Sequence, residues 1–289
     1  MCYFNYPFIG DWVKMMQKKV KVRPRKAIKI LFWLIIIMVL IFIYARYINT
    51  HGLITKEIAV VDSQLNSAYN GLKIVHFSDL HYGRTTLEDD LKEIIQEINL
   101  LKPDLIVFTG DLFDDHKMKD EDIKTVTKYL EQLEARLFKL AVIGDYDQEY
   151  LETYQTILED SNFILLDNSS KLVYDNSDIP INLVGLTNTN DIKELYENDY
   201  FTITLVHEPD SITSLDGSNL VFAGHSLGGQ IKIPFIGGII KRDGANKYIN
   251  DYYEVSGQQL YISSGIGTQD FSFRLFNKPS INFYRLYNE

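Results

Sequence analysis

Residues 221–230 read Val221-Phe222-Ala223-Gly224-His225-Ser226-Leu227-Gly228-Gly229-Gln230. A short apolar run that ends at a glycine is typical of a buried strand, and the histidine-containing loop marks the end of that strand. The same order of apolar run and polar loop occurs four more times earlier in the chain. The four loops are Phe77-Ser78-Asp79-Leu80-His81, Gly110-Asp111-Leu112-Phe113-Asp114, Gly144-Asp145-Tyr146-Asp147 and Val206-His207-Glu208-Pro209. This recurrence predicts an α/β fold that gathers polar side chains at the ends of its strands.

Helical periodicity separates the strand-like runs of the first half of the chain. Apolar residues recur every three or four positions over 87–101 and 120–135, and 149–159 is a third helix candidate. The expected strands are Ile58–Val61, Leu72–Phe77, Leu105–Phe108, Leu140–Ile143, Phe163–Leu166, Lys171–Tyr174, Ile181–Leu186, Phe201–Val206, Leu220–Ala223, Gln230–Ile233, Leu260–Ser263 and Ile281–Leu286. A βαβαβ first half followed by a strand-rich second half fits two stacked sheets with helices outside. The pattern alone does not exclude other α/β layouts.

A basic segment followed by an apolar one opens the chain. Residues 1–29 carry eight Lys or Arg and one acid, and residues 30–45 contain no charge and no helix breaker. A buried core helix and a cleaved signal peptide are the alternatives, but no cleavage site of small residues follows. The pattern therefore predicts a single-pass signal anchor in the cell membrane. Residues 1–29 would be a cytoplasmic tail, 30–48 the membrane span and 49–289 an extracytoplasmic domain.

The charge of the remaining chain excludes some partners. Of the 29 basic and 39 acidic residues, 21 and 38 lie after residue 29. Such an acidic balance argues against nucleic acid as a partner and against electrostatic adhesion to anionic lipid. The one cysteine, Cys2, lies in the basic tail, so the domain has no disulfide.

The five polar loops contain the ligands of a metal site. Asp79 and His81 are two residues apart, so an extended backbone would point both side chains the same way. Any one of these loops could be an ordinary turn, but five after successive strands favour a shared site. Carboxylate and imidazole together suit divalent Mn, Fe or Zn. We therefore expect one or two divalent metal ions at the strand ends.

Several segments between about Lys56 and Leu286 carry a resemblance to a known family. They are Ser78-Asp79-Leu80-His81, Gly110-Asp111-Leu112-Phe113-Asp114, His207-Glu208-Pro209-Asp210, Gly228-Gly229-Gln230-Ile231-Lys232-Ile233-Pro234 and Ser264-Gly265-Ile266-Gly267, with Arg274-Leu275 and Pro279. In these segments the chain resembles the calcineurin-like metallophosphoesterases, especially their membrane-anchored single-domain bacterial branch. The resemblance implies a four-layer α-β-β-α sandwich of two mixed sheets that holds two metals.

The resemblance also implies roles for individual residues. Asp79 and His81 would bind the first metal, Asp111 would bridge both metals, and His207 and His225 would bind the second. Asp114 and Asp147 would orient these ligands from behind.

Two motifs depart from the family pattern. The Gly-Asn-His-Asp motif reads Gly144-Asp145-Tyr146-Asp147, and the Gly-His-Thr-His motif reads Gly224-His225-Ser226-Leu227. Asp145 retains an oxygen ligand, whereas Tyr146 replaces a histidine that would stabilise or protonate the leaving group. Leu227 replaces an imidazole of the first metal, which would keep Asp79, His81 and Asp111. The second metal would keep Asp111, Asp145, His207 and His225.

Two functions remain open from the sequence. The first is a tethered metal-dependent phosphoesterase or pyrophosphatase, with Tyr146 in the catalytic position, acting on a phosphorylated substrate of the cell envelope beside the lipid bilayer. The second is a silenced pseudoenzyme that binds a metal or a phosphorylated ligand as a sensor or scaffold, as Tyr146 and Leu227 together would suggest. His116 is a candidate for the missing imidazole, although a solvated loop histidine is the simpler interpretation. The sequence does not set the substrate or the oligomeric state.

Overall fold

The computed structural model describes residues 24–114, 118–187, 193–196 and 199–289, and the chain divides into two units between Ile43 and Tyr44. Helix α2 (Pro24–Ile43) is the described part of the first unit, and a π-helical turn, η1 (Tyr44–Ile48), begins the second. Together, Lys26–Ile48 form a helix long and apolar enough, by length and composition, to cross a membrane. Twenty helical residues rise about 30 Å, the thickness of the hydrocarbon core of a bilayer. His116, proposed above as a spare ligand, lies outside the described residues.

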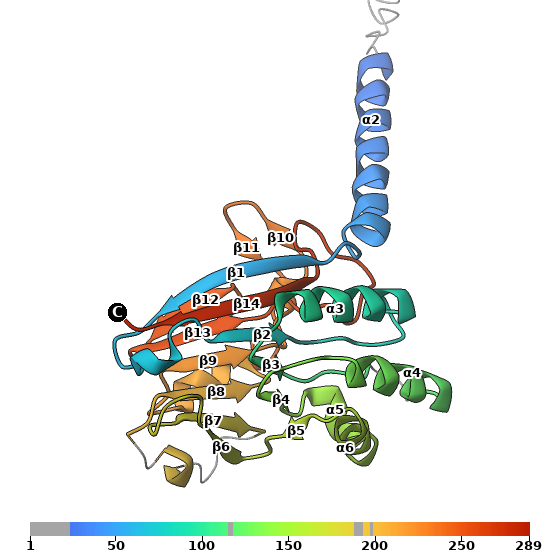
Figure 1. Cartoon of the computed structure of the whole chain (residues 1–289). Coiled ribbons are helices and arrows are strands. Elements are labelled where there is room, and N and C mark those ends of the chain that lie inside the picture. Colours follow the sequence, from blue (N-terminus) through green and yellow to red (C-terminus); the bar gives the residue numbers. More distant parts are fainter. Residues whose placement is uncertain (1–23, 115–117, 188–192, 197–198) are drawn as a thin grey trace, which may run out of the picture. The chain divides into compact units, whose positions relative to one another are not determined.

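The described part of the second unit is built on two six-stranded mixed sheets (Figure 1). The first sheet has the order β1 (Ile54–Val61), β14 (Ser280–Tyr287), β2 (Lys73–Phe77), β3 (Leu105–Phe108), β4 (Phe138–Ala141) and β5 (Ile164–Leu165). The second has the order β12 (Tyr252–Val255), β13 (Gln258–Ile262), β9 (Leu220–Ala223), β8 (Thr202–Val206), β7 (Ile181–Leu186) and β6 (Ser169–Val173). A hairpin of β10 (Lys232–Ile233) and β11 (Gly237–Gly238) stands apart from both sheets.

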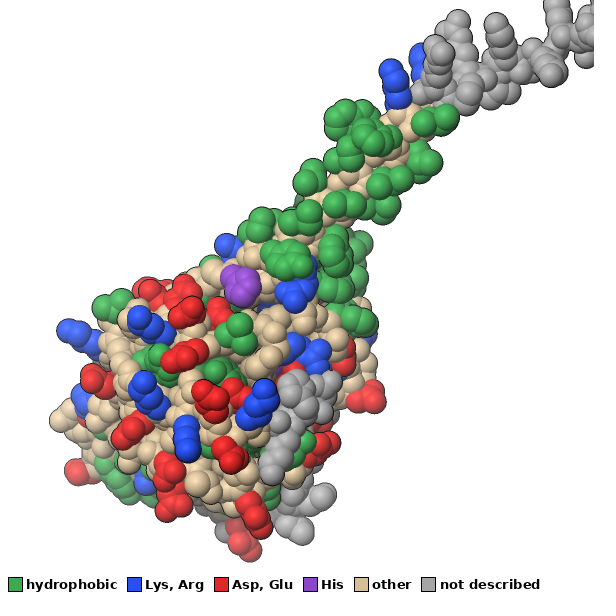
Figure 2. All heavy atoms as spheres, turned by 90° about the vertical axis from the view of Figure 1, so that its right-hand side faces the viewer, with side chains coloured by type: hydrophobic (Ala, Val, Ile, Leu, Met, Phe, Trp, Pro, Cys, Tyr) green, Lys and Arg blue, Asp and Glu red, His purple; other side chains and the backbone are tan. Residues whose placement is uncertain are grey.

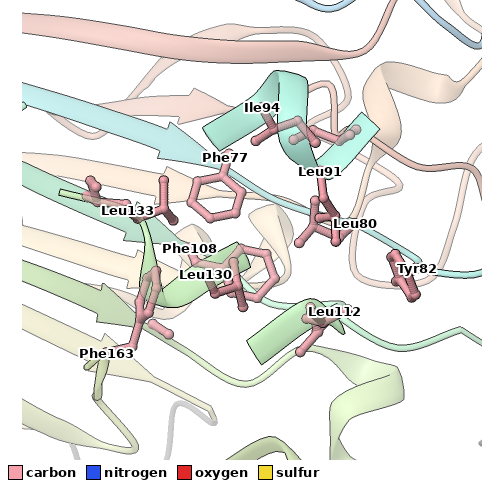
Figure 3. Packing of buried hydrophobic residues seen from close by; sticks show 14 of the residues in the cluster. Phe77, Leu80, Tyr82, Leu91, Ile94, Phe108, Leu112, Leu130, Leu133 and Phe163 are labelled. Atoms are coloured by element: carbon pink, nitrogen blue, oxygen red, sulfur yellow. The ribbon is translucent and has the colours of Figure 1, made fainter. Parts of the chain in front are cut away.

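Helices cover the outer face of the first sheet. They are α3 (Glu88–Leu101), α4 (Asp120–Glu131) and α6 (Leu151–Asp160), with the short α5 (Asp145–Glu149) before α6. Leu91 and Ile94 of α3 and Leu130 of α4 pack on Phe77 and Phe108, whose rings stack 4.9 Å apart (Figure 3). This packing fixes the direction in which β2 and β3 deliver the loops that follow them.

A second core fills the space between the two sheets. Apolar side chains of β2, β3 and β4 meet those of β7, β8 and β9 there. The outer face of the second sheet is covered by the 3-10 helices η3 (Lys193–Tyr196) and η4 (Pro209–Ser214). The two mixed sheets and their flanking layers confirm the predicted α/β sandwich. The last layer is thin, because Pro209 and the Ser and Thr residues after it do not favour a longer helix.

The boundaries of several elements differ from the prediction. Strand β1 begins at Ile54 rather than at Ile58, because the parallel pairing with β14 continues to Ser280. The expected strand over 230–233 is reduced to Lys232–Ile233. Strand β12 was missed altogether, since this edge strand alternates half-buried and exposed residues and lacks an apolar run. The expected helix over 149–159 begins at Leu151.

His76 of β2 is buried in the core between the sheets. Its Nε2 lies 2.8 Å from Thr109 Oγ1, and its ring lies against Phe222 and Tyr284. Burial lowers the pKa of His76 to about 3. Folding therefore has to exclude a proton from this imidazole at mildly acidic pH.

We expect the His76→Phe variant to lose less stability in acid than the native chain. A folded-state pKa of about 3 lies below the unfolded value of about 6.5, so this histidine costs stability as the pH falls below 6.5. Between pH 7 and pH 5 the cost is about 2 kcal/mol. Chemical denaturation of the full chain in detergent at both pH values measures it. His51→Phe, at an exposed histidine, should keep the pH dependence of the native chain. An equal loss of unfolding free energy between pH 7 and pH 5 in all three chains would contradict the account.

Candidate metal centre

The ends of five strands bring the predicted site residues together. Parallel β2, β3 and β4 end just before the loops that carry Asp79, Asp111 and Asp145. Parallel β8 and β9 of the second sheet end just before His207 and His225. The carboxyl ends of the two sheets therefore supply one site from opposite sides.

Asp79, His81 and Asp111 form the first of two ligand groups. Their candidate ligand atoms all lie within 4.8 Å of one another, and all three residues are buried. His81 Nε2 lies 3.7 Å from Asp111 Oδ2 and 4.0 Å from Asp79 Oδ1. Among the described residues, neither His81 Nε2 nor Asp111 Oδ2 makes a hydrogen bond. Buried polar atoms without hydrogen bonds are costly, and a cation between them would satisfy both.

Asp111, His207 and His225 form the second group, so Asp111 belongs to both. His207 Nε2 lies 3.2 Å from Asp111 Oδ2, and His225 Nδ1 lies 3.2 Å from His207 Nε2. Asp145, at the start of α5, places Oδ2 3.1 Å from His225 Nδ1. Asp145 thus brings a second carboxylate beside the two imidazoles of this group.

Backbone carbonyls orient the three imidazoles. His81 Nδ1 lies 3.1 Å from the carbonyl oxygen of Phe113. His207 Nδ1 lies 2.6 Å from the carbonyl oxygen of Thr109. His225 Nε2 lies 2.6 Å from the carbonyl oxygen of Asp243. Because a carbonyl only accepts, each of these ring nitrogens carries the hydrogen. The other nitrogen of each ring is then free to bind a metal.

Asp147 holds the loops after β3 and β4 together. Its carboxylate accepts hydrogen bonds from the backbone N–H groups of Asp111, Leu112, Phe113 and Gly144, at 2.8–3.3 Å. Burial and the negative charge of Asp111 raise the pKa of Asp147 to about 7, although the backbone donors favour its charged form. Asp147 therefore positions Asp111, which belongs to both ligand groups.

Asp114 contacts a different part of the site. It forms an ion pair with Arg84, and its Oδ1 lies 3.9 Å from His81 Nδ1. That is beyond hydrogen-bond distance, and the Phe113 carbonyl is the closer partner of the imidazole. Asp114 thus ties the loop that follows His81 to the loop that follows Asp111.

The backbone is strained at the candidate ligands. Asp79, His81, Asp111 and His225 have φ angles of 54°, 42°, 59° and 62°. This left-handed region costs a residue other than glycine on the order of 1–3 kcal/mol, and such strain concentrates at functional sites. The loop after β4 packs closely against Asp111. A Cβ at Gly144 would clash with the backbone nitrogen and the carboxylate of Asp111.

The carboxylates of the site favour a cation. Burial works against charge on His207, but the Asp111 carboxylate raises its pKa well above the ordinary value. Burial likewise opposes charge on Asp145, yet the hydrogen bond to His225 holds its pKa below the usual range. The carboxylates thus draw protons onto the imidazoles when no metal is bound. A divalent ion would take the place of these protons, so the residues fit the metals predicted from the sequence.

The chain was also compared with known proteins. A family model described as calcineurin-like phosphoesterase matches residues 72–232, more than half of the chain. The chain is 32% identical over 254 residues to YkuE of Bacillus subtilis, named an uncharacterized metallophosphoesterase, and the match covers 84% of this chain and 88% of that one. This chain belongs to the calcineurin-like phosphoesterase family. The family resemblance is thereby confirmed, and with it a hydrolase family that acts on phosphoester bonds with divalent metals.

Two further relatives carry more specific names. LpxG of Chlamydia muridarum, a UDP-2,3-diacylglucosamine pyrophosphatase, is 29% identical over 224 residues, which cover 57% of this chain and 66% of LpxG. A transmembrane protein with metallophosphoesterase domain from Danio rerio is 23% identical over 273 residues, which cover 84% of this chain and 61% of that protein.

Leu227 follows His225 by two positions in the loop after β9. It is fully buried, and its φ angle is 48°. A Cβ at Gly265 would clash with the Leu227 side chain and come within 3.0 Å of Asp79 Cβ and 3.4 Å of Arg274 Nη2. The leucine therefore fills space directly beside Asp79. In the described part of the chain, no other histidine or carboxylate joins the first ligand group.

Tyr146 lies over the first ligand group of this phosphoesterase. Its ring meets the ring of His81 edge-on at 5.6 Å, and its backbone N–H donates to Asp111 Oδ1 at 3.0 Å. Its hydroxyl accepts a hydrogen bond from Gln269 Nε2 at 3.0 Å. Burial raises the pKa of the phenol above 10, so the hydroxyl keeps its proton at neutral pH.

Sequence reasoning missed several polar residues around the centre. Gln230 accepts hydrogen bonds from Arg242 and from the backbone of Gln269, and Arg242 also pairs with Asp270. Nε and Nη1 of Arg242 are buried without hydrogen bonds to the described residues. Among these residues, only Gln230 belongs to a motif, the Gly-Gly-Gln segment, that could have indicated it. The other residues are far from Gln230 in sequence and belong to no motif.

A polar cleft adjoins the second ligand group. It has a volume of ≈ 280 Å³. Asp145, Gln148, Thr187, Glu208 and Ser211 are among the residues that line it. The cleft therefore leaves open space beside Asp145 and His207.

We expect Asp147→Asn to destabilise the chain and weaken metal binding. An amide would direct two N–H groups toward backbone N–H groups that now donate to a carboxylate. The loss of buried hydrogen bonds should lower the free energy of unfolding by about 1–3 kcal/mol. Denaturation and Mn²⁺ titration calorimetry of the full chain measure both effects. Asp160→Asn, at an exposed aspartate, is the matched control and should change neither stability nor Mn²⁺ affinity. If Asp147→Asn keeps the stability and the Mn²⁺ affinity of the native chain, Asp147 does not position Asp111.

Proposed function

We propose that this chain is a membrane-anchored, metal-dependent phosphoesterase or pyrophosphatase that hydrolyses a phosphorylated substrate of the cell envelope. The observation that carries the proposal is the sharing of Asp111 by two buried carboxylate–histidine groups at the strand ends. Two cations held a short distance apart are suited to a displacement at phosphorus. Membership of the phosphoesterase family supports this chemistry.

The proposed ligands divide between two metal positions. Asp79, His81 and Asp111 would hold the first ion, and Asp111, Asp145, His207 and His225 would hold the second. Bound ions would supply positive charge to the phosphoryl oxygens, and we expect Mn, Fe or Zn from the donor set. The first position has three protein ligands and lacks the imidazole that Leu227 replaces. We therefore expect it to bind its ion more weakly than the second position does.

Tyr146 would assist the leaving group by hydrogen bonding rather than by proton transfer. Its hydroxyl already accepts from Gln269, so its own hydrogen is available to a substrate oxygen. With a pKa raised above 10, the phenol is a poor general acid at neutral pH. A substrate whose leaving group needs no proton, such as a pyrophosphate, suits this site best. The pyrophosphatase name of LpxG is consistent with that class.

The anchoring of the enzyme defines where the substrate is found. We propose residues 1–29 as a cytoplasmic tail, 30–48 as the membrane span and 49–289 as the extracytoplasmic domain. The apolar helix and the basic residues before it support this topology. A tethered domain meets its substrate at the bilayer surface, which favours a phosphorylated envelope component.

A silenced enzyme is the second candidate. The observation that favours it is the complete burial of Leu227 beside Asp79, where an imidazole would have bound the first ion. In that case the second ligand group would retain one metal or a phosphorylated ligand without turnover. The chain would then act as a sensor or scaffold.

Hydrolysis of a chromogenic phosphodiester by the full chain in detergent separates the two candidates. We expect the native chain to turn over with Mn²⁺ or Zn²⁺ and to stop with chelator, because the second ligand group is complete. Asp111→Asn should abolish turnover. If only a chain carrying Asp145→Asn, Tyr146→His and Leu227→His is active, the fold is competent and the native site is silenced.

The leaving group of the substrate tests the role of Tyr146. A histidine can donate a proton where this phenol cannot, and general acid catalysis contributes about 10²–10⁴-fold. Tyr146→His should therefore accelerate hydrolysis of an alkyl phosphate monoester far more than that of a pyrophosphate. Steady-state rates on both substrates measure the difference. Equal acceleration of both would show that Tyr146 does not limit the departure of the leaving group.

A further inference from the structure

The globular unit exposes an apolar face. Three segments, 44–48, 231–242 and 271–279, contribute the exposed side chains that we call the docking face, namely Tyr47, Ile48, Phe235, Ile236, Phe271 and Phe276. Phe235 and Ile236, at the turn of the β10–β11 hairpin, are 108% and 73% exposed. Figure 2 shows hydrophobic side chains, with Lys and Arg among them, on one face of this unit. Large apolar side chains gathered in this way mark a binding surface.

The three segments are joined by direct contacts. Ala45 O accepts a hydrogen bond from Arg274 N at 2.9 Å, and the Tyr44 and Phe276 rings lie 6.5 Å apart. Leu275 O in turn accepts from Lys232 N at 2.8 Å, so the hairpin lies beside the same loop. The three segments therefore adjoin one another.

The face differs in charge from the rest of the unit. Its three segments contain six basic residues and no Asp or Glu, whereas residues 30–289 carry 21 basic and 38 acidic residues. Of the six, Arg274 is buried and Lys232 pairs with Asp251. Lys241 and Lys278 are exposed, and the neighbouring Asp270 is paired with Arg242. Exposed aromatic side chains beside lysines are typical of surfaces that lie at the interface of an anionic bilayer.

Chain continuity decides which partner covers the face. The helix that could cross a membrane ends at Ile48, whereas the globular unit already begins at Tyr44. The two ranges overlap at residues 44–48, so these residues cannot leave the bilayer surface if the helix spans it. The segments packed on them are held at the same surface.

We propose that the docking face inserts into the interface of the anionic lipid bilayer in which the chain is anchored. The proposal rests on the anchoring described under the proposed function. It also assigns the place of the metal centre, because Ile231 follows His225 by six positions, at most about 20 Å of extended chain. Gln230 joins the two regions, since its side chain donates to the carbonyl groups of Phe271 and Phe273. The metal centre is thus held close to the lipid headgroups, where a phosphorylated lipid is within reach.

A fluorescent probe on the hairpin tests the contact. The full chain carrying Cys2→Ser and Phe235→Cys is labelled with a nitrobenzoxadiazole dye and reconstituted in phosphatidylcholine–phosphatidylglycerol vesicles. Leu172→Cys, on the strand β6 at the far edge of the second sheet and also exposed, is the matched control. We expect a blue shift at position 235 and a loss of intensity with lipids spin-labelled near the top of the acyl chain. Position 172 should show neither.

Each other outcome overturns the proposal in a distinct way. No blue shift at position 235 means that the hairpin remains in water. A blue shift without quenching by the spin-labelled lipids means that a protein, such as a second copy of the chain, covers the face. Flotation of the same vesicles shows separately whether the chain is anchored, and hydrolysis assays report on catalysis. Failure of the docking contact is therefore distinguishable from failure of the proposed function.

Discussion

One buried carboxylate controls the geometry on which the metal centre depends. The Asp147 carboxylate accepts hydrogen bonds from four backbone N–H groups in the loops after β3 and β4. Asp111 lies on the first of these loops. Because Asp111 belongs to both ligand groups, its position sets the distance between them. The core under α3 and α4 fixes the strands, and Asp147 fixes the loops that leave them.

The family resemblance implies three changed residues at the centre, and two of them lie beside the first ligand group. Leu227 fills space beside Asp79, and Tyr146 lies against His81, so both changes concern the first ligand group. The third changed residue, Asp145, lies beside His225 of the second group. The proposed first metal position therefore has fewer protein ligands than the proposed second position.

The sequence revealed more about the identity of the site than about its shape. Apolar runs followed by Asp, His and Gly were enough to predict the strands and the candidate ligands, because buried strands and their ends have a local signature. The left-handed φ angle of Asp111 has no local signature, since neighbouring loops impose it. The Tyr146–Gln269 hydrogen bond joins residues 123 positions apart. Strand β12 was missed because an edge strand needs no apolar run.

The central claim is that the buried carboxylates and imidazoles hold a divalent cation. Metal analysis by mass spectrometry of the purified full chain, after exposure to Mn²⁺ or Zn²⁺ and removal of excess ion, tests it most directly. The account predicts at least one bound ion per native chain, loss of that ion in Asp111→Asn, and its retention in Asp160→Asn. A native chain that retains no ion, or an Asp111→Asn chain that retains as many as the native one, would contradict the account.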